Sequence, residues 1–307
     1  MNGGLYRIEH ETRYAHRGGV STSQHLAYLT PRTLPRQCVR WHDLTIEPAP
    51  ASCVQRVDYF GNAVDQFTIL TPYDELCVVG RSLVEVLAAE PPVDPEASAE
   101  WETVRDELSY ERGAAYADAS EFSFPSPYAV TAPELAEFAR DSFAPKRPVV
   151  AAAIHLMHRI HEGFAFDPGS TTIATPVTRV LADRRGVCQD FAHLQIGCLR
   201  SLGLAARYVS GYLLTEPPPG QARLVGADAS HAWLSIWCPR LGWVDLDPTN
   251  DVLPSHRHVT LAWGRDYGDV SPLRGVVLGG RTHTLHVGVS VTPAMEGDAS
   301  PAEAGSV

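Results

Sequence analysis

The segment from Cys188 to Leu202 constrains the fold most, because its pattern fits a helix that is apolar nearly all round. Its apolar positions are Phe191, Ala192, Leu194, Ile196, Cys198, Leu199 and Leu202. A helix without a continuous polar face must be buried in the middle of a domain. Gly203 follows directly, at the position where a left-handed residue commonly ends a helix. The sequence therefore predicts a core built around this helix.

Strands are predicted after this helix at about 206–215, 231–238 and 242–247, with further strand patterns at 258–263 and 282–291. Two helices are predicted before it, at 133–139 and at about 149–163. One central helix packed against consecutive antiparallel strands is the arrangement of an α+β domain. We therefore predict the α+β class for this part of the chain.

The first 90 residues have the pattern of short strands. Turn signals such as Thr30-Pro31 and Phe60-Gly61-Asn62 separate these strands, with a spacing typical of an antiparallel sandwich. We predict four parts: an N-terminal β-sandwich-like domain at 1–90, a connector at 91–132, a core with C-terminal strands at 133–292, and a disordered tail at 293–307.

The charge balance argues against nucleic acid as a partner. The chain has 25 Lys and Arg against 36 Asp and Glu, a formal charge of -11, whereas affinity for phosphates requires concentrated basic residues. No apolar run approaches the roughly 20 residues that span a bilayer, and residues 1–10 lack the apolar stretch of a signal peptide. We therefore expect a cytoplasmic protein without a membrane partner.

Six cysteines lie far apart, with no C-x-x-C pair, which suggests neither a zinc knuckle nor a compact disulfide framework. Cys188 differs from the rest because it starts the predicted buried helix. The positive end of the helix dipole favours a thiolate there, and the free backbone N–H groups beside it can stabilise the oxyanion of a tetrahedral intermediate. Cys188 is therefore our candidate nucleophile.

A cysteine nucleophile needs a base, and His231 lies 43 residues further on, at the start of a predicted strand. Asp247 follows after another 16 residues, about the length of one hairpin, so adjacent antiparallel strands would bring its carboxylate to the imidazole. Nucleophile, base and orienting acid would then converge. Asp245 shares a strand face with Asp247, so strand parity leaves both acids open.

Three blocks of sequence carry a family resemblance. They are Gly186-Val187-Cys188-Gln189-Asp190-Phe191-Ala192-His193-Leu194, Ser230-His231-Ala232-Trp233, and Asp247-Pro248-Thr249-Asn250. In this order they resemble the bacterial transglutaminase-like superfamily. Within it, they resemble the group whose members are described as cysteine proteases. Residues 6–86 resemble the β region that precedes these cores, and residues 264–275 resemble the segment that follows them. The likeness covers most of the chain.

The resemblance implies a papain-like core with a Cys-His-Asp triad. It places the triad on Cys188, His231 and Asp247, the last chosen over Asp245 by its match to the Asp-Pro-Thr block. It also implies a tryptophan that assists the oxyanion, a role for which the sequence leaves three candidates open. These are Trp233, Trp237 and Trp243.

Other polar residues have simpler interpretations. Asp190 and His193, in the first turns of the buried helix, are expected to be structural rather than catalytic. Cys188, His193 and His231 lack the close ligand spacing of a zinc site, so we expect neither a metal nor another cofactor. Three histidines on the helix at 149–163 are expected to be solvated or interfacial: His155, His158 and His161.

The triad predicts attack by Cys188 on an amide carbonyl and an acyl-enzyme. Water as the second nucleophile gives a protease, peptidase or deamidase, and an amine gives a transglutaminase. We expect a hydrolase of peptide or protein substrates, because the sequence shows no amine site and nothing that excludes water. The alternatives are a protein-glutamine acyltransferase and a non-catalytic peptide-binding scaffold, and the oligomeric state stays open.

Overall fold

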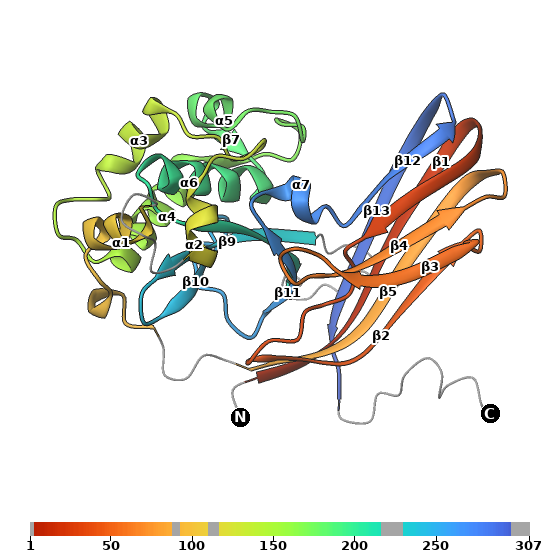
Figure 1. Ribbon diagram of the computed structural model, residues 1–307, viewed down its shortest axis with the longest axis horizontal. Coiled ribbons are helices and arrows are strands. Elements are labelled where there is room, and N and C mark those ends of the chain that lie inside the picture. Colours follow the sequence, from red (N-terminus) through yellow and green to blue (C-terminus); the bar gives the residue numbers. More distant parts are fainter. Residues whose placement is uncertain (1–2, 88–92, 110–116, 216–229, 296–307) are drawn as a thin grey trace, which may run out of the picture.

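A computed structural model describes residues 3–87, 93–109, 117–215 and 230–295. Figure 1 shows a long β part beside a part that contains the helices. The β part consists of β1 (Gly3–Ala27), β2 (Gln37–Glu47), β3 (Ser52–Val57), β4 (Ala63–Ile69), β5 (Tyr73–Leu87), β12 (Leu273–Gly279) and β13 (Thr282–Pro293). The first and the last strands of the described chain therefore belong to the same sheet.

Strand β1 takes part in two layers. Its first half pairs with β5 on one edge and with β13 on the other, and its second half pairs with β4 and β12. Strands β2 and β3 extend the two layers at the outer edges of β5 and β4. The predicted sandwich is confirmed, although its strands form one continuous hydrogen-bonded sheet.

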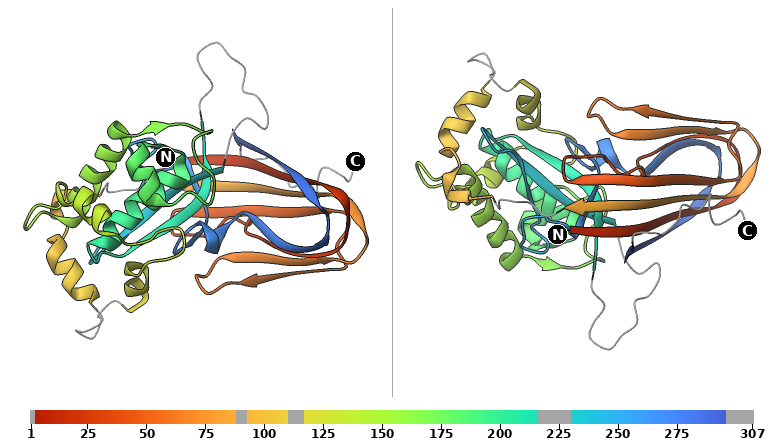
Figure 2. Two further views of the ribbon diagram at one scale, coloured as in Figure 1. Left: turned by 90° about the horizontal axis from the view of Figure 1, so that it is seen from above. Right: turned by 90° about the horizontal axis from the view of Figure 1, so that it is seen from below.

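Two glycine pairs make the turn between the layers. Gly18 and Gly19 have φ of +94° and +64°, and Gly279 and Gly280 repeat these values beside them. Such positive φ values favour glycine over residues with a Cβ atom. Figure 2 shows the turns gathered at the end of the sandwich that lies far from the helices. An apolar cluster fills the space between the layers: Val20, Ala27, Leu29, Phe67, Ile69, Tyr73, Leu76, Val78 and Leu273.

The C-terminal strands do not belong to the core, which corrects the predicted assignment of 133–292. Local patterning identified the strand at 282–291 but not its partner, and β12 and β13 both pair with β1 at the other end of the chain. Pro293, expected in the tail, ends β13, and residues 296–307 lie outside the described residues.

The second part contains a four-stranded antiparallel sheet in the order β10-β9-β8-β11. Its strands are β8 (Ala206–Leu213), β9 (Ser230–Cys238), β10 (Gly242–Leu246) and β11 (His258–Gly264). The helices are α1 (Trp101–Leu108), α2 (Ala117–Ser120), α3 (Pro133–Arg140), α4 (Val149–Gly163), α5 (Val177–Asp183), α6 (Cys188–Ser201) and α7 (Tyr267–Val270). Short pieces complete this part: 3-10 helices Pro95–Ala97 and Glu121–Ser123, and the parallel pair β6 (Ala165–Phe166) and β7 (Arg185–Gly186). The predicted α+β class is confirmed.

Helix α6 lies at the centre of this part, as its sequence predicts. Every residue from Asp190 to Arg200 is buried, and the helix packs against β8, β9 and the helices α3, α4 and α5. Gly203 ends the helical segment with φ +80°. The buried Arg200 donates to the carbonyl oxygens of Phe122, Ala206 and Arg265 and so joins the connector to the core.

Two buried amide side chains join the sandwich to the core sheet at its edge strand β11. The Gln37 amide donates to the Thr260 carbonyl at 2.7 Å and accepts from the Thr260 N–H at 2.8 Å. Asn62 Oδ1 accepts from the Trp263 N–H at 3.0 Å. These bonds satisfy backbone groups that an open sheet edge would leave exposed. Among the described residues, no helix combines the length and apolarity needed to cross a membrane.

Candidate active site

Cys188 is the first residue of α6 and is half-buried. Asp190 fixes the start of this helix, because its Oδ2 accepts from the Val187 N–H at 2.8 Å and from the Thr171 hydroxyl at 2.6 Å. The first N–H groups of a helix have no intrahelical acceptor, so the backbone around Cys188 presents free donors. Asp190 makes the structural contacts expected of it, and Cys188 occupies the expected position.

His231 lies on β9 between Asp247 and Cys188. Its Nε2 is 2.7 Å from Asp247 Oδ2, and the Cys188 thiol is close enough to contribute to the pKa of the ring. Burial opposes a charge on this ring, but the bonds to Asp247 and Cys188, with the negative charges of both groups, outweigh burial and raise the pKa of His231 to about 10. The structure therefore brings the three predicted residues together.

Asp247 follows β10 and is completely buried. Its Oδ2 accepts from His231, from the Asn250 amide at 2.7 Å and from His258 Nε2 at 3.1 Å, while Oδ1 accepts from the N–H groups of Thr249 and Asn250. Burial alone would raise the pKa of Asp247, but the hydrogen bonds from His231 and His258 prevail and hold it well below its usual range. A charged acid is thus fixed behind the imidazole.

Asp245, the other acid left open by strand parity, has a different partner. It pairs across the sheet with Ser235, whose hydroxyl donates to its Oδ1. Ser235 is four residues from His231 along β9, so Asp245 lies four residue pairs, roughly 13 Å, away from the imidazole. The strand register therefore selects Asp247 as the carboxylate that meets His231.

His258 is a part of this cluster that the sequence did not predict. It is buried at the start of β11, and its Nδ1 has no hydrogen-bond partner among the described residues. The only signal in the sequence is a polar residue at the start of an apolar strand, the same signal that marks His231. No spacing rule links His258 to Asp247, because a loop of irregular structure separates them.

Trp233 supports the imidazole from within the sheet. Its ring is fully buried, with its centroid 6.0 Å from that of His231 and 5.3 Å from that of His258. Gly211 faces His231 across β8 and β9, and a Cβ atom there would lie 2.4 Å from the Trp233 ring. The glycine makes room for the indole. Trp237 and Trp243 pack against each other, so Trp233 is the tryptophan beside the catalytic candidates.

Helix α4 holds the loop that carries the acid. His161 Nδ1 lies 3.0 Å from the Thr249 carbonyl oxygen, and His158 bonds to Asp251. His155 turns away and bonds to Ser142 at 3.0 Å. The three histidines are therefore interfacial in different directions, one of the two surroundings that the sequence predicted for them.

His193 serves the core rather than the catalytic cluster. Its ring stacks between Tyr128 and Tyr208, and its Nε2 accepts from the Tyr267 N–H at 3.1 Å. Burial lowers the pKa of His193 to about 3, so the ring is neutral. This residue has the structural role that the sequence predicted.

The described residues contain one group of side chains that could converge on a metal ion. The ligand atoms of His231, Asp247 and His258 lie within 4.8 Å of one another. Both imidazole Nε2 atoms lie at hydrogen-bond distance from the same carboxylate oxygen, which suits two N–H donors sharing one acceptor. The hydrogen bonds from the two imidazole N–H groups to their shared carboxylate oxygen therefore account for this geometry.

Comparison with known families agrees with this arrangement. Residues 6–85 match the family model of the bacterial transglutaminase-like N-terminal region, and residues 136–248 match that of the transglutaminase-like superfamily. The chain belongs to the transglutaminase-like superfamily. The family that the three sequence blocks predicted is thereby confirmed.

Three similar proteins place this transglutaminase-like chain among its relatives. It is 43% identical over 302 residues to the uncharacterized protein Rv2569c of Mycobacterium tuberculosis, covering 96% of this chain and 94% of the relative. It is 37% identical over 123 residues to the protein-glutamine gamma-glutamyltransferase of Pseudomonas aeruginosa, covering 39% of this chain and 18% of that protein. The crystal structure of "a Putative Cysteine Protease from Cytophaga hutchinsonii" aligns with a TM-score of 0.72 and 20% identity, over 98% of this chain and 94% of the other, and so shares the fold.

Proposed function

We propose that this protein is a cysteine-dependent amide hydrolase of peptides or proteins, with Cys188 as nucleophile, His231 as base and Asp247 as orienting acid. One observation carries the proposal: a buried imidazole is hydrogen-bonded to a buried carboxylate, and its pKa is raised both by that carboxylate and by a thiol at a helix start. These are the three roles that nucleophilic catalysis requires.

The reaction starts from a thiolate and an imidazolium. The raised pKa of His231 keeps its ring protonated at neutral pH, and the positive end of α6 favours the negative sulfur of Cys188. The thiolate attacks the amide carbonyl carbon, and backbone N–H groups at the helix start donate to the resulting oxyanion. The C–N bond then breaks as His231 gives its proton to the leaving amine.

The second half of the reaction releases the acyl group. His231, now neutral, takes a proton from water as the water oxygen attacks the thioester carbon. The C–S bond then breaks, which frees the carboxylic acid and restores the thiolate. Asp247 stays ionised throughout and stabilises the imidazolium whenever it forms.

Acyl transfer to an amine is the second candidate. It is favoured by the 37% identity, over 123 residues, to a protein-glutamine gamma-glutamyltransferase. The chemistry differs only in the second nucleophile, because an amine would replace water at the thioester. The same triad therefore serves both reactions, and the products distinguish them.

The test supplies both nucleophiles in one assay. Peptide libraries and a glutamine-containing donor peptide are incubated with the protein and a labelled primary amine, and mass spectrometry measures cleavage, deamidation and amine incorporation. We expect hydrolysed products to exceed amine adducts. Faster amine incorporation would assign the protein as an acyltransferase. A Cys188→Ala variant that retains full activity would refute the nucleophile.

Alkylation tests the thiolate without a substrate. At pH 6.5, iodoacetamide should modify Cys188 faster than the exposed Cys38, and it should leave Cys198 unmodified because burial raises the pKa of that thiol. Cys38 controls for access and Cys198 for burial. Equal rates at Cys188 and Cys38, together with no turnover, would favour a non-catalytic scaffold.

A further inference from the structure

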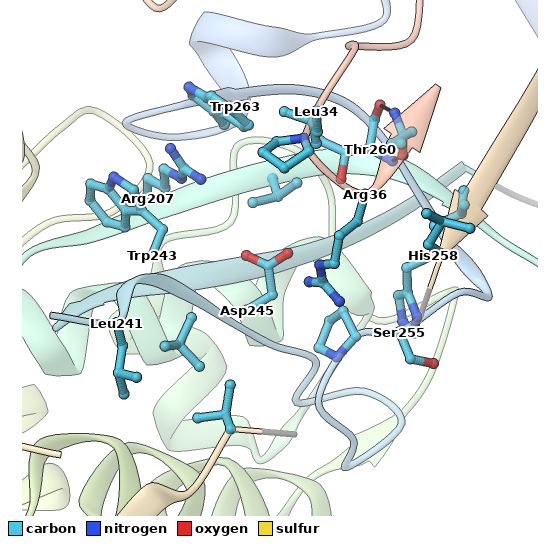
Figure 3. Close-up of a pocket in the computed structure, with 18 residues that line it drawn as sticks. Leu34, Arg36, Arg207, Leu241, Trp243, Asp245, Ser255, His258, Thr260 and Trp263 are labelled. Carbon is cyan, nitrogen blue, oxygen red and sulfur yellow. Dashed lines mark hydrogen bonds between the residues drawn. The ribbon is translucent and has the colours of Figure 1, made fainter. Parts of the chain in front are cut away.

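A cavity of about 570 Å³ lies between the sandwich and the core sheet (Figure 3). One wall comes from the segment 34–37 and the end of β5, and the other from β8, β10 and β11. Cys188 and His231 are not among the lining residues, so this space differs from the surroundings of the nucleophile. Its volume is within the usual range for small-molecule sites, about 300–1,000 Å³.

Two arginines and one acid supply the charge of this cavity. Arg207 extends from β8, Arg36 reaches in from the opposite wall, and Asp245 lies between them on β10 (Figure 3). Within the part of the chain that the structure describes, neither arginine forms an ion pair. The lining therefore carries an excess of positive charge.

Arg207 is nine-tenths buried and incompletely bonded. Its guanidinium packs 4.4 Å from the Trp243 ring centroid and 3.8 Å from that of Trp263. Its single hydrogen bond among the described residues runs from Nε to Ser235 at 3.3 Å, so both Nη groups lack an acceptor there. Burial lowers the pKa of Arg207 to about 9, although Asp245 partly opposes this effect. A buried guanidinium with free N–H groups is suited to a carboxylate, which it can bind with two parallel bonds.

The remaining lining is largely apolar. It includes Val86, Leu87, Val93, Val209 and Leu241. An inorganic anion would leave these side chains facing an empty or hydrated space. A carboxylate with an apolar body satisfies both the arginines and these walls.

We propose that this cavity binds a small organic carboxylate, with its anionic group bonded to the guanidinium groups of Arg207 and Arg36 and its apolar body against the aliphatic wall. The site shares one side chain with the catalytic cluster. His258 lines the cavity and also bonds to Asp247. A ligand in this cavity therefore contacts the same imidazole that supports the catalytic acid.

Calorimetry on the full chain carrying Cys188→Ala tests the proposal, with 3-phenylpropanoate as the probe and its neutral amide, 3-phenylpropanamide, as the matched ligand. The acid should bind at least about tenfold more tightly than the amide, because only the acid forms charge-assisted hydrogen bonds with the two arginines. Equal affinities for the two probes, or no binding of either, would overturn the proposal. The result is independent of the hydrolase assignment, because no turnover is measured.

Variants then locate the bound carboxylate. Arg36→Gln and Arg207→Gln should each weaken binding of the acid about tenfold and leave that of the amide unchanged. Arg140→Gln, which removes an exposed arginine on α3, is the control and should bind like the parent protein. If Arg207→Gln does not fold, the exposed Arg36 still provides the test. Retained affinity for the acid in Arg36→Gln would contradict the proposed site.

Discussion

His231 Nε2 lies 2.7 Å from Asp247 Oδ2, and both side chains are buried. An Asp247→Asn variant keeps the shape but loses the charge that stabilises the imidazolium, so we expect kcat to fall by roughly 10²–10⁴-fold. The pKa of His231 should fall as well, because the carboxylate is the main group that raises it. Steady-state kinetics on the best library peptide measure the loss. Asp141→Asn, an exposed acid, is the control, and a near-normal kcat in Asp247→Asn would contradict the assigned role.

His258 should act as a positioning residue for Asp247. A His258→Phe variant removes the 3.1 Å bond and should lower kcat about tenfold with little change in KM, whereas His258→Gln retains a donor and should recover most of the activity. The bond from His258 helps to lower the pKa of Asp247. Its loss therefore raises that pKa towards its usual range. Equal kcat in the Phe variant and the wild type, or no recovery in His258→Gln, would exclude this role.

The stability of the protein should depend on pH through His231. Its pKa rises on folding from 6.5 to about 10, so its stabilising contribution is complete below pH 6.5 and is lost as the pH rises through about 10. Urea unfolding at pH 6 and pH 10 should show a larger loss of stability for the wild type than for His231→Gln. Parallel losses in the two proteins would mean that the folded imidazole gains no such charge stabilisation.

Gly211→Ala should destabilise the protein by about 1–3 kcal/mol, because the added methyl group would overlap the Val259 carbonyl oxygen and the Trp233 ring in a packed layer. Displacement of that ring should also lower activity, since it packs beside His231. Gly163→Ala is a matched control whose nearest contact is an ordinary 3.7 Å, to Arg184. Denaturant titration measures both variants, and equal midpoints would show that the sheet accommodates the methyl group.

Removal of metal should leave the reaction unchanged. Dialysis against EDTA should preserve kcat, because the proposed steps use only a thiolate and an imidazole. Added Zn²⁺ should inhibit, since a cation would compete for the Nε2 atoms of His231 and His258. Loss of activity in EDTA that is restored by a divalent metal would instead assign this cluster to metal catalysis.

The sequence predicted those parts of the site that depend on local pattern. The apolar run after Cys188 indicated a buried helix, and a helix start is the place where a thiol gains backbone donors. The hairpin-length separation of His231 and Asp247 indicated that they could meet. The choice between Asp245 and Asp247 needed either the family resemblance or the register of β9 and β10, which the structure supplies.

Contacts between distant segments could not be predicted in this way. The contact between His258 and Asp247 depends on the order of the strands in the sheet, in which β8 separates β11 from β9. No short motif encodes that order. The same limit explains the misplaced C-terminal strands. The alternation in residues 282–291 predicts a strand, whereas the pairing of Tyr6 with Pro293 depends on how the whole chain closes.

The pairing of β1 with β12 and β13 has a consequence for synthesis. Strand β1 is made before the other described strands, and the strands that cover one of its edges, β12 and β13, are made after them. While the nascent chain grows, β1 can pair with β4 and β5, but its other edge has no partner until β12 and β13 have left the ribosome. An uncovered strand edge is a template for other chains. Truncated translation products that lack the last two strands would therefore carry a permanent site for aggregation.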